Sequence, residues 1–278
     1  MYLKENQIVA IKLLAKYKYL TSSQFVKMGL YKKRGYLTNS LKSMIDQKKP
    51  LIAKHDFNPL NGKLESMYFL TKYGKKFLME ELDFNEDKIK APKSLAPVYL
   101  KDYFHRKYTV NFYIQFNMWL DSTKGKLIFL NYYFDKSGNN RISKASKHVT
   151  ALNKIIIDQG NSLIPDINAK FSLNDKENLL LFEQHNGKDT NRLYEQLEVH
   201  ISAIFKKAVS KKYNFKKVYK VVVVCEYESV KISVIQRLKK VNGIEHYNNF
   251  FIFKTNSELE KDFYTNWTLI SGEQVNFF

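Results

Sequence analysis

Two short apolar segments followed by a helix pattern constrain the fold of this chain more than any other feature. Residues 163–171 alternate apolar and polar side chains, which is the period-two pattern of a half-buried strand. Residues 179–185 form an apolar run that is typical of a buried strand, and the turn-forming pair Asn186-Gly187 follows it. Over residues 189–209, apolar side chains recur at steps of three and four. The sequence therefore predicts two strands and then a helix.

The polar residues of these strands are candidates for chemistry. Asp166 belongs to the polar set of the first strand, while Glu183 and His185 lie two apart on the second and so share a face. Two carboxylates beside a nitrogen base are the groups with which a divalent cation can hold a phosphodiester and activate water. We therefore expect Asp166 and Glu183 to bind Mg²⁺ or Mn²⁺. His185 would orient or deprotonate the attacking group, or bind the metal.

A structural alternative is that Asp166 and Glu183 are strand-end acids in salt bridges, as clustered acids often are. Three further kinds of residue are weaker candidates. Asp135, at the end of a strand expected over residues 126–134, is a candidate third metal ligand. Supporting roles beside the site are open to His200, Glu195 and Glu198 on the following helix. A covalent tyrosine nucleophile is conceivable, but the spacing of the 19 tyrosines singles none out.

The amino-terminal residues have the pattern of a small DNA-binding domain. Helical apolar spacing occurs over residues 5–18 and 37–45, and Thr21 opens a capping box for a short helix between them. Two strand-like runs follow, residues 51–53 and 67–70, with a turn-prone loop between them. Three short helices followed by such a hairpin predict a winged helix-turn-helix.

Basic residues dominate this segment, because residues 1–76 contain 16 Lys and Arg against 4 Asp and Glu. Basic and polar side chains on the third helix and the wing are placed where such a domain meets phosphates and base edges. We expect DNA contacts from Lys32, Lys33, Arg34, Asn39, Ser40, Lys42, Lys54 and Lys63. For each of them the alternative is a solvated charged face.

Two local motifs resemble those of known families. Residues 69–78 resemble the leucine-threonine-x-x-glycine end of many bacterial winged-helix domains, where the last wing strand runs into a closing helix. The stretch from Pro165-Asp166 to Glu183 and His185 resembles the restriction-endonuclease-like core, whose motif is Pro-Asp and then Asp or Glu, any residue, Lys. His185 stands in the place of that lysine.

The whole chain resembles the replication-relaxation family of plasmid and mobile-element proteins. In that family a Pro-Asp strand precedes a strand that ends in Glu-x-Asp with a glycine soon after; Pro165, Asp166, Glu183 and Gly187 match, and His185 departs from the family's acid. The resemblance implies an α/β fold, α+β overall. It comprises a winged helix-turn-helix over residues 1–90, a linker over 91–98, and a restriction-endonuclease-like core over 99–278 with a mixed sheet flanked by helices.

The amino-acid composition limits the classes of molecule that this chain is expected to bind. Lys and Arg outnumber Asp and Glu by 46 to 27, giving a net charge of +19, which favours a polyanion such as double-stranded DNA, or single-stranded DNA at a nick. A lone cysteine and the lack of an apolar signal or membrane-spanning segment favour the cytoplasm and no membrane partner. The sequence contains neither a histidine-hydrophobe-histidine triad nor a GxxxxGK phosphate loop.

As the resemblance implies, the function would be relaxase-like, metal-dependent DNA nicking in mobilisation or replication. The main alternative is a non-catalytic replication initiator or transcriptional regulator with a degenerate nuclease core. A restriction-type double-strand nuclease is a third interpretation, and it would require a homodimer to cut both strands. Plasmid transfer or replication proteins are the expected protein partners.

Overall fold

The computed structural model describes residues 3–31, 33–58, 62–92, 99–137 and 150–278. The helices are α1 (Glu5–Tyr17), α2 (Ser22–Lys27), α3 (Arg34–Ile45), α4 (Lys72–Glu81), α5 (Tyr103–Ser122), α6 (Thr190–Phe205), α7 (Ala208–Tyr213), α8 (Glu228–Leu238) and α9 (Asn256–Lys261). The strands are β1 (Leu20–Thr21), β2 (Ile52–His55), β3 (Met67–Leu70), β4 (Lys126–Tyr132), β5 (Lys136–Ser137), β6 (Thr150–Ala151), β7 (Ile155–Asp158), β8 (Asn161–Leu163), β9 (Ile167–Leu173), β10 (Lys176–His185), β11 (Lys220–Cys225), β12 (Phe251–Thr255), β13 (Trp267–Leu269) and β14 (Gln274–Val275).

The chain forms two compact units, Met1–Ile114 and Gln115–Phe278, and α5 contributes residues to both. Most of the segment expected as a linker, residues 93–98, lies outside the described residues. Helices and strands alternate along the second unit, and its main sheet contains both parallel and antiparallel pairs. The protein is therefore a mixed α/β protein with a mixed sheet, as the sequence predicts.

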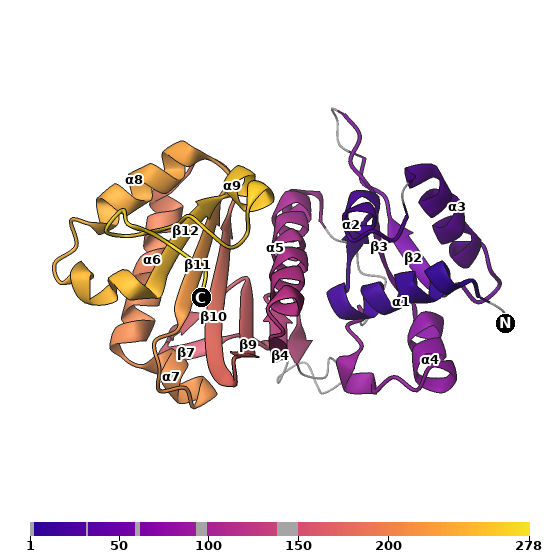
Figure 1. The fold of residues 1–278 in the computed structure, drawn as a ribbon, viewed down its shortest axis with the longest axis horizontal. Coiled ribbons are helices and arrows are strands. Elements are labelled where there is room, and N and C mark those ends of the chain that lie inside the picture. Colours follow the sequence, from indigo (N-terminus) through magenta and orange to yellow (C-terminus); the bar gives the residue numbers. More distant parts are fainter. Residues whose placement is uncertain (1–2, 32, 59–61, 93–98, 138–149) are drawn as a thin grey trace. The chain divides into compact units, whose positions relative to one another are not determined.

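In unit 1, helices α1 to α3 lie beside an antiparallel sheet of order β1-β3-β2 (Figure 1). The expected capping box is present at the start of α2, where the backbone N–H of Thr21 donates to Gln24 Oε1 at 2.8 Å. Apolar side chains that recur at helical spacing form the core, with Ile11, Leu14 and Leu41 fully buried. The three helices and the β2–β3 hairpin confirm the elements predicted for this segment.

The leucine-threonine-x-x-glycine motif has a direct structural explanation. Thr71 Oγ1 accepts hydrogen bonds from the backbone N–H groups of Tyr73 and Gly74, so it caps α4. The backbone N–H of Thr71 donates to the carbonyl oxygen of Leu51 at 3.1 Å, which ties the start of α4 to the strand region before β2. An added Cβ on Gly74 would lie 2.0 Å from that same oxygen. Only glycine fits at this close approach.

Replacing Gly74 by Ala is expected to destabilise the protein, because the Leu51 carbonyl could withdraw only by giving up its bond from Thr71. We expect the free energy of unfolding in urea to fall by about 1–3 kcal/mol. Gly35→Ala on α3 is the matched control, since nothing lies within 4 Å of its added Cβ. That variant should be neutral or gain up to about 1 kcal/mol from helix propensity. Equal stability of the two variants would contradict the packing described.

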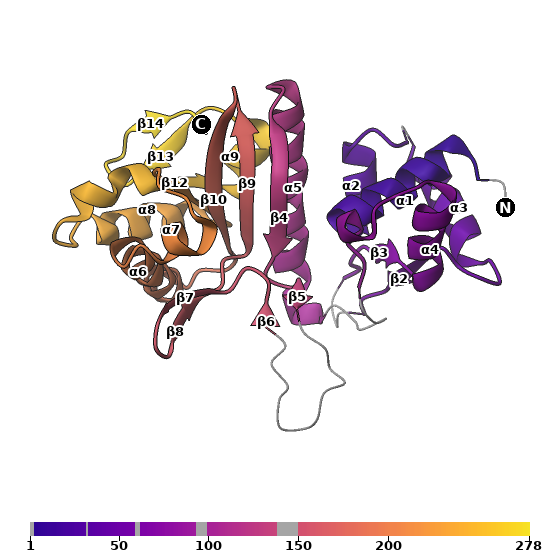
Figure 2. The same ribbon diagram turned by 90° about the horizontal axis from the view of Figure 1, so that it is seen from below.

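Unit 2 is built on a seven-stranded sheet of order β14-β13-β12-β11-β10-β9-β4. Strands β4, β9 and β10 are antiparallel neighbours, and β10, β11 and β12 run parallel. Helices α6 and α7 connect β10 to β11, and α8 connects β11 to β12. The part of α5 that belongs to unit 2 covers one face, where Phe116 and Trp119 contact Phe171, and α6 to α8 cover the other (Figures 1 and 2).

Several boundaries differ from the sequence prediction. The strand expected over residues 163–171 is divided: Leu163 ends β8, and β9 begins only at Ile167, because Pro165 between them has no N–H for a ladder hydrogen bond. The helix expected over residues 189–209 ends at Phe205, since Lys207 adopts a left-handed backbone conformation with φ of 55°. The β7–β8 hairpin, α9, β13 and β14 were not predicted.

The lone cysteine of the sequence, Cys225, is buried in β11, and burial raises the pKa of its thiol to about 12. None of the helices within the described residues combines the length and the apolar character required to cross a membrane.

Candidate functional site

The candidate site lies at the edge of the unit 2 sheet where β10, β11 and β12 end and β9 begins. Because β9 and β10 are antiparallel, the start of one lies beside the end of the other. The last registered pair is Ile167 with Phe182, so Asp166 and Glu183 are the next neighbours along the ladder. The backbone N–H of Asp166 donates to the Phe182 carbonyl at 2.9 Å. The two predicted carboxylates are therefore adjacent across the two strands.

Both carboxylates lie on the sheet face that α6 and α7 cover. Leu181 belongs to the core formed with these helices, and Glu183, two residues later, shares its face. On β9, the side-chain amide of Asn168 donates to the hydroxyl of Tyr213 in α7, so Asp166, two residues earlier, faces the same way. The sequence pattern predicts a shared face for Glu183 and His185, and the position of Asp166 on that face is an addition from the structure.

Glu183 is fully buried and contacts two side chains of α6. Its Oε1 lies 2.6 Å from His200 Nε2, and its Oε2 accepts a hydrogen bond from the Gln196 amide. Gln196 and His200 are four residues apart, so they project from one face of α6 toward the carboxylate. His200 thus has the supporting position expected of it. Gln196 was not predicted, although its spacing from His200 was a usable signal.

Burial disfavours both charged forms in this pair. It raises the pKa of Glu183 well above the usual range of a carboxyl group, and the negative charge of Asp166 raises it further. Burial also lowers the pKa of His200 to about 3. Burial therefore favours the neutral carboxyl form of Glu183 and the neutral imidazole form of His200. His200 Nδ1 has no hydrogen-bond partner among the described residues.

Asp166 is fixed by the strand beside it. Its Oδ2 accepts a hydrogen bond of 2.7 Å from the backbone N–H of Gln184, which follows Glu183 on β10. Its own carbonyl accepts from the N–H of Tyr133 after β4. These backbone contacts position the Asp166 carboxylate without using a flexible partner.

His185 ends β10 as a fully buried residue on the same face as Glu183, and it pairs in register with Cys225 of β11. The turn after it is held by Glu226, whose N–H donates to the His185 carbonyl and whose carboxylate accepts from the N–H of Gly187 at 2.8 Å. Gly187 has φ of 87°, which favours glycine. The glycine two residues after His185 thus allows the chain to leave the sheet.

The other residues expected at the site do not contact Asp166 or Glu183 in the bonds described above. Asp135 is buried, but its Oδ2 accepts from the backbone N–H of Tyr132, so this carboxylate closes the turn at the end of β4. Glu195 and Glu198 are exposed, on the part of α6 that turns away from the buried Leu197 and His200. Among the described residues, no group of three or more His, Cys, Asp and Glu side chains is arranged to hold a metal ion.

The expected DNA-contacting residues are mostly exposed where the structure describes them. Lys33, Asn39 and Lys42 are exposed at or on α3, and Lys63 is exposed near the β2–β3 hairpin. The Ser40 hydroxyl accepts from Tyr31 at 2.8 Å, and Lys54 forms a 2.8 Å ion pair with Asp56. Lys32 lies outside the described residues, as does the side chain of Arg34.

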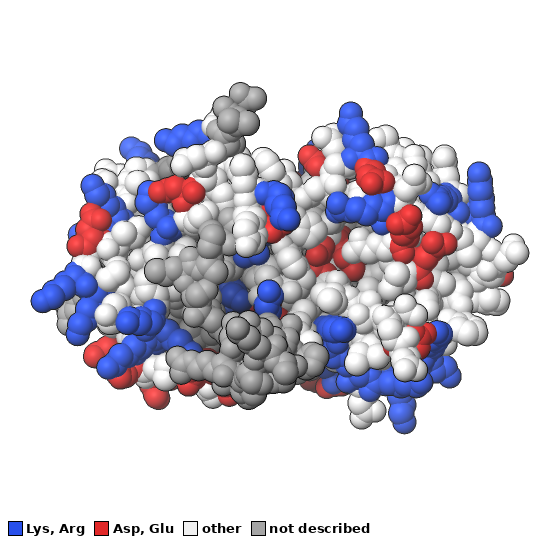
Figure 3. Space-filling view, turned by 180° about the vertical axis from the view of Figure 1, so that it is seen from behind, with Lys and Arg blue, Asp and Glu red and all other residues white. Residues whose placement is uncertain are grey.

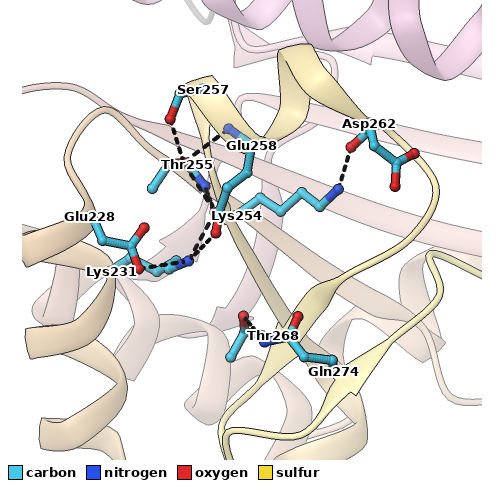
Figure 4. Close-up of polar contacts among 9 residues, drawn as sticks. All are labelled: Glu228, Lys231, Lys254, Thr255, Ser257, Glu258, Asp262, Thr268 and Gln274. Carbon is cyan, nitrogen blue, oxygen red and sulfur yellow. Dashed lines mark hydrogen bonds and ion pairs between the residues drawn. The ribbon is translucent and has the colours of Figure 1, made fainter.

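A second polar cluster lies near the ends of β11 and β12 (Figure 4). The ammonium group of Lys231, a buried residue of α8, contacts Glu258 at 2.7 Å and Glu228 at 3.0 Å. Glu258 also forms the capping box of α9 with Thr255. Lys254 donates to the backbone carbonyl of Asp262. Because these groups bind one another, the cluster holds α8 and α9 against the sheet.

Comparison with known proteins adds no assignment: no protein-family model matches the chain, and neither a curated protein nor a solved structure is significantly similar to it. The site itself offers two adjacent carboxylates, Asp166 and Glu183, with His185 on the same face and His200 bound to Glu183. Carboxylate oxygens are the donors that hard cations prefer, and an acid next to an imidazole is a pairing that proteins use for proton transfer.

Proposed function

We propose that this protein binds DNA through unit 1, acting as a winged helix, and nicks a DNA strand at Asp166 and Glu183 in plasmid mobilisation or replication. The observation that carries the proposal is the adjacency of these two carboxylates across β9 and β10, on one face of the sheet. The order of strand, strand, helix and strand on which the nuclease resemblance rests is also the order of β9, β10, α6 and β11. A nicking assay on supercoiled plasmid tests the proposal.

The residues fit a divalent cation by donor type, because Mg²⁺ and Mn²⁺ prefer carboxylate oxygens. Asp166 and Glu183 would hold it, and when bound it would supply charge neutralisation at the phosphate and an activated water. Glu183 would bind the cation as a carboxylate, and its Oε1 lies 2.6 Å from His200 Nε2. The Gln184 N–H keeps the Asp166 carboxylate oriented throughout.

A specific observation favours the non-catalytic alternative as the second candidate function. Both oxygen atoms of Glu183 already have partners on α6, Gln196 and His200, as expected for a carboxyl group that serves the fold. A replication initiator or regulator with this core would bind DNA without cutting it. Metal binding distinguishes the two candidate functions. If the site is a nuclease site, Mn²⁺ should raise the melting temperature of the protein, and this increase should be absent in the Asp166→Asn variant.

Replacing Asn39 and Lys42 together by Ala should weaken binding to double-stranded DNA, because both side chains are exposed on α3. We expect the affinity to fall about tenfold or more. The slope of log K, the association constant, against log salt concentration should become shallower by the amount that about one lost phosphate contact causes. The control is Lys76→Ala on α4, which also removes one positive charge, from a side chain that is 66% exposed. If both variants bind alike in a fluorescence-anisotropy titration, α3 is not the recognition helix.

A further inference from the structure

A cavity of about 440 Å³ in unit 2 is lined by four lysines, and its position near the candidate site suggests a ligand. Lys154 precedes β7, while Lys206, Lys211 and Lys212 lie around the break between α6 and α7. The volume falls within the range of about 300–1,000 Å³ that is common for ligand sites. Figure 3 shows Lys and Arg side chains gathered at the end of unit 2 that carries α7.

The four ammonium groups are not neutralised equally. Lys206 forms an ion pair with Asp158. Lys212 donates to the backbone carbonyls of Leu152 at 3.1 Å and Lys154 at 2.6 Å, and its partial burial lowers its pKa. Within the described ranges of the chain, Lys154 and Lys211 have no acidic partner. The cavity therefore carries excess positive charge that an anion would neutralise.

Apolar groups accompany this charge. Ile156 lines the cavity although it is 70% exposed, and Phe205, directly before Lys206, is 74% exposed. Exposed apolar and aromatic side chains next to lysines are the combination with which proteins hold a nucleic-acid strand, with phosphates on the ammonium groups and bases against the rings.

Two segments of the chain that line the cavity also reach the candidate site. Lys206 directly follows α6 and lies six residues after His200, which is about 9 Å along a helix. Lys154 follows Asn153, whose side-chain amide donates to the carbonyl of Pro165 directly before Asp166. A DNA strand carries one phosphate per about 3.4 Å of helix axis, so one strand can reach both places within a few nucleotides.

We propose that the Lys154–Lys211 cavity binds a phosphate of single-stranded DNA a few nucleotides from the strand position at Asp166 and Glu183. This inference rests on the proposed function and adds a strand-binding site to it. The bound group is a phosphodiester, and Phe205 supplies a surface on which an adjacent base stacks.

The test measures binding without cutting. A fluorescent short oligothymidylate is titrated in EDTA into the Glu183→Gln protein, and into the same protein carrying Lys154→Ala and Lys211→Ala. We expect the double substitution to weaken binding at least about tenfold, and Phe205→Ala to weaken it at least about fivefold. Lys216→Ala with Lys217→Ala removes the same charge from exposed lysines outside the cavity and should change affinity less than about threefold.

Equal weakening by the two double substitutions, or no change, would overturn the inference. It would also be overturned if vesicles containing phosphatidylserine bind through Lys154 and Lys211 while the oligonucleotide does not. A second measurement avoids substitutions: lysine acylation read by mass spectrometry should show Lys154 and Lys211 protected by the oligonucleotide, and Lys216 unprotected. This test does not depend on cutting. If the Lys154→Ala, Lys211→Ala substitutions leave oligonucleotide binding unchanged while the unmutated protein nicks plasmid, the strand-binding site is wrong and the proposed nicking function stands.

Discussion

Replacing Glu183 by Gln is expected to reduce metal-dependent nicking of supercoiled DNA by about 100-fold or more. The amide cannot carry the negative charge that a divalent cation requires, and the loss of a metal ligand removes several kcal/mol of stabilisation from the reaction. The fold should survive, because the environment of Glu183 already favours a neutral side chain of this size. We expect the free energy of unfolding to change by less than about 1 kcal/mol.

Glu177→Gln is the matched control, since it removes a carboxylate from the same strand at an exposed position paired with Lys170. It should nick DNA at the unmutated rate. Initial rates of open-circle formation in Mg²⁺ and in Mn²⁺ provide the measurement, and urea unfolding provides the check on folding. A Glu183→Gln protein that nicks as fast as the Glu177→Gln protein would show that Glu183 is only a structural residue.

Replacing His200 by Ala is expected to give the largest loss of stability at the site, about 2–4 kcal/mol. The imidazole is fully buried, so its removal leaves a cavity under α6. It also removes the partner 2.6 Å from Glu183 Oε1, leaving a buried carboxyl group with one fewer hydrogen bond. Urea unfolding measures this effect.

His246→Ala, at a side chain that is 80% exposed, is the control and should change stability by less than about 0.5 kcal/mol. A double-mutant cycle isolates the interaction. If His200 and Glu183 stabilise one another, His200→Ala should cost less in a Glu183→Ala background, with a coupling of about 1 kcal/mol or more. Additive effects would contradict a stabilising contact between His200 and Glu183.

The parts of the fold that were predictable have long periodic patterns. Helices α1, α3 and α6 each bury one regular set of side chains, so their apolar spacing shows in the sequence. Strand β10 is buried on both faces over residues 179–185, and its apolar run shows this. Strands β13 and β14 contain only three and two residues, too few to establish a period. The end of α6 depends on a left-handed backbone at Lys207, and lysine is not a residue type that marks such a turn.

The candidate site was predictable in its strand residues and less so in its surroundings. Asp166 and Glu183 were identified from the patterns of their two strands, whereas their adjacency comes from an antiparallel register that the structure adds. The contact of Gln196 with Glu183 depends on how α6 lies on the sheet, and a glutamine on an amphipathic helix is usually solvated. Whether Asp135 faces the site or its own backbone depends on the turn after β4, which the sequence does not specify.

The most direct test of the central claim is incubation of the purified protein with supercoiled plasmid carrying its own origin region, in Mg²⁺, in Mn²⁺ and in EDTA. The double variant Asp166→Ala, Glu183→Ala is assayed beside it. The proposal predicts open circles in either metal, none in EDTA, and none from the double variant although it still binds the DNA. Open circles formed equally by the double variant, or DNA binding with no nicking in any metal, would contradict the assignment of these carboxylates to catalysis.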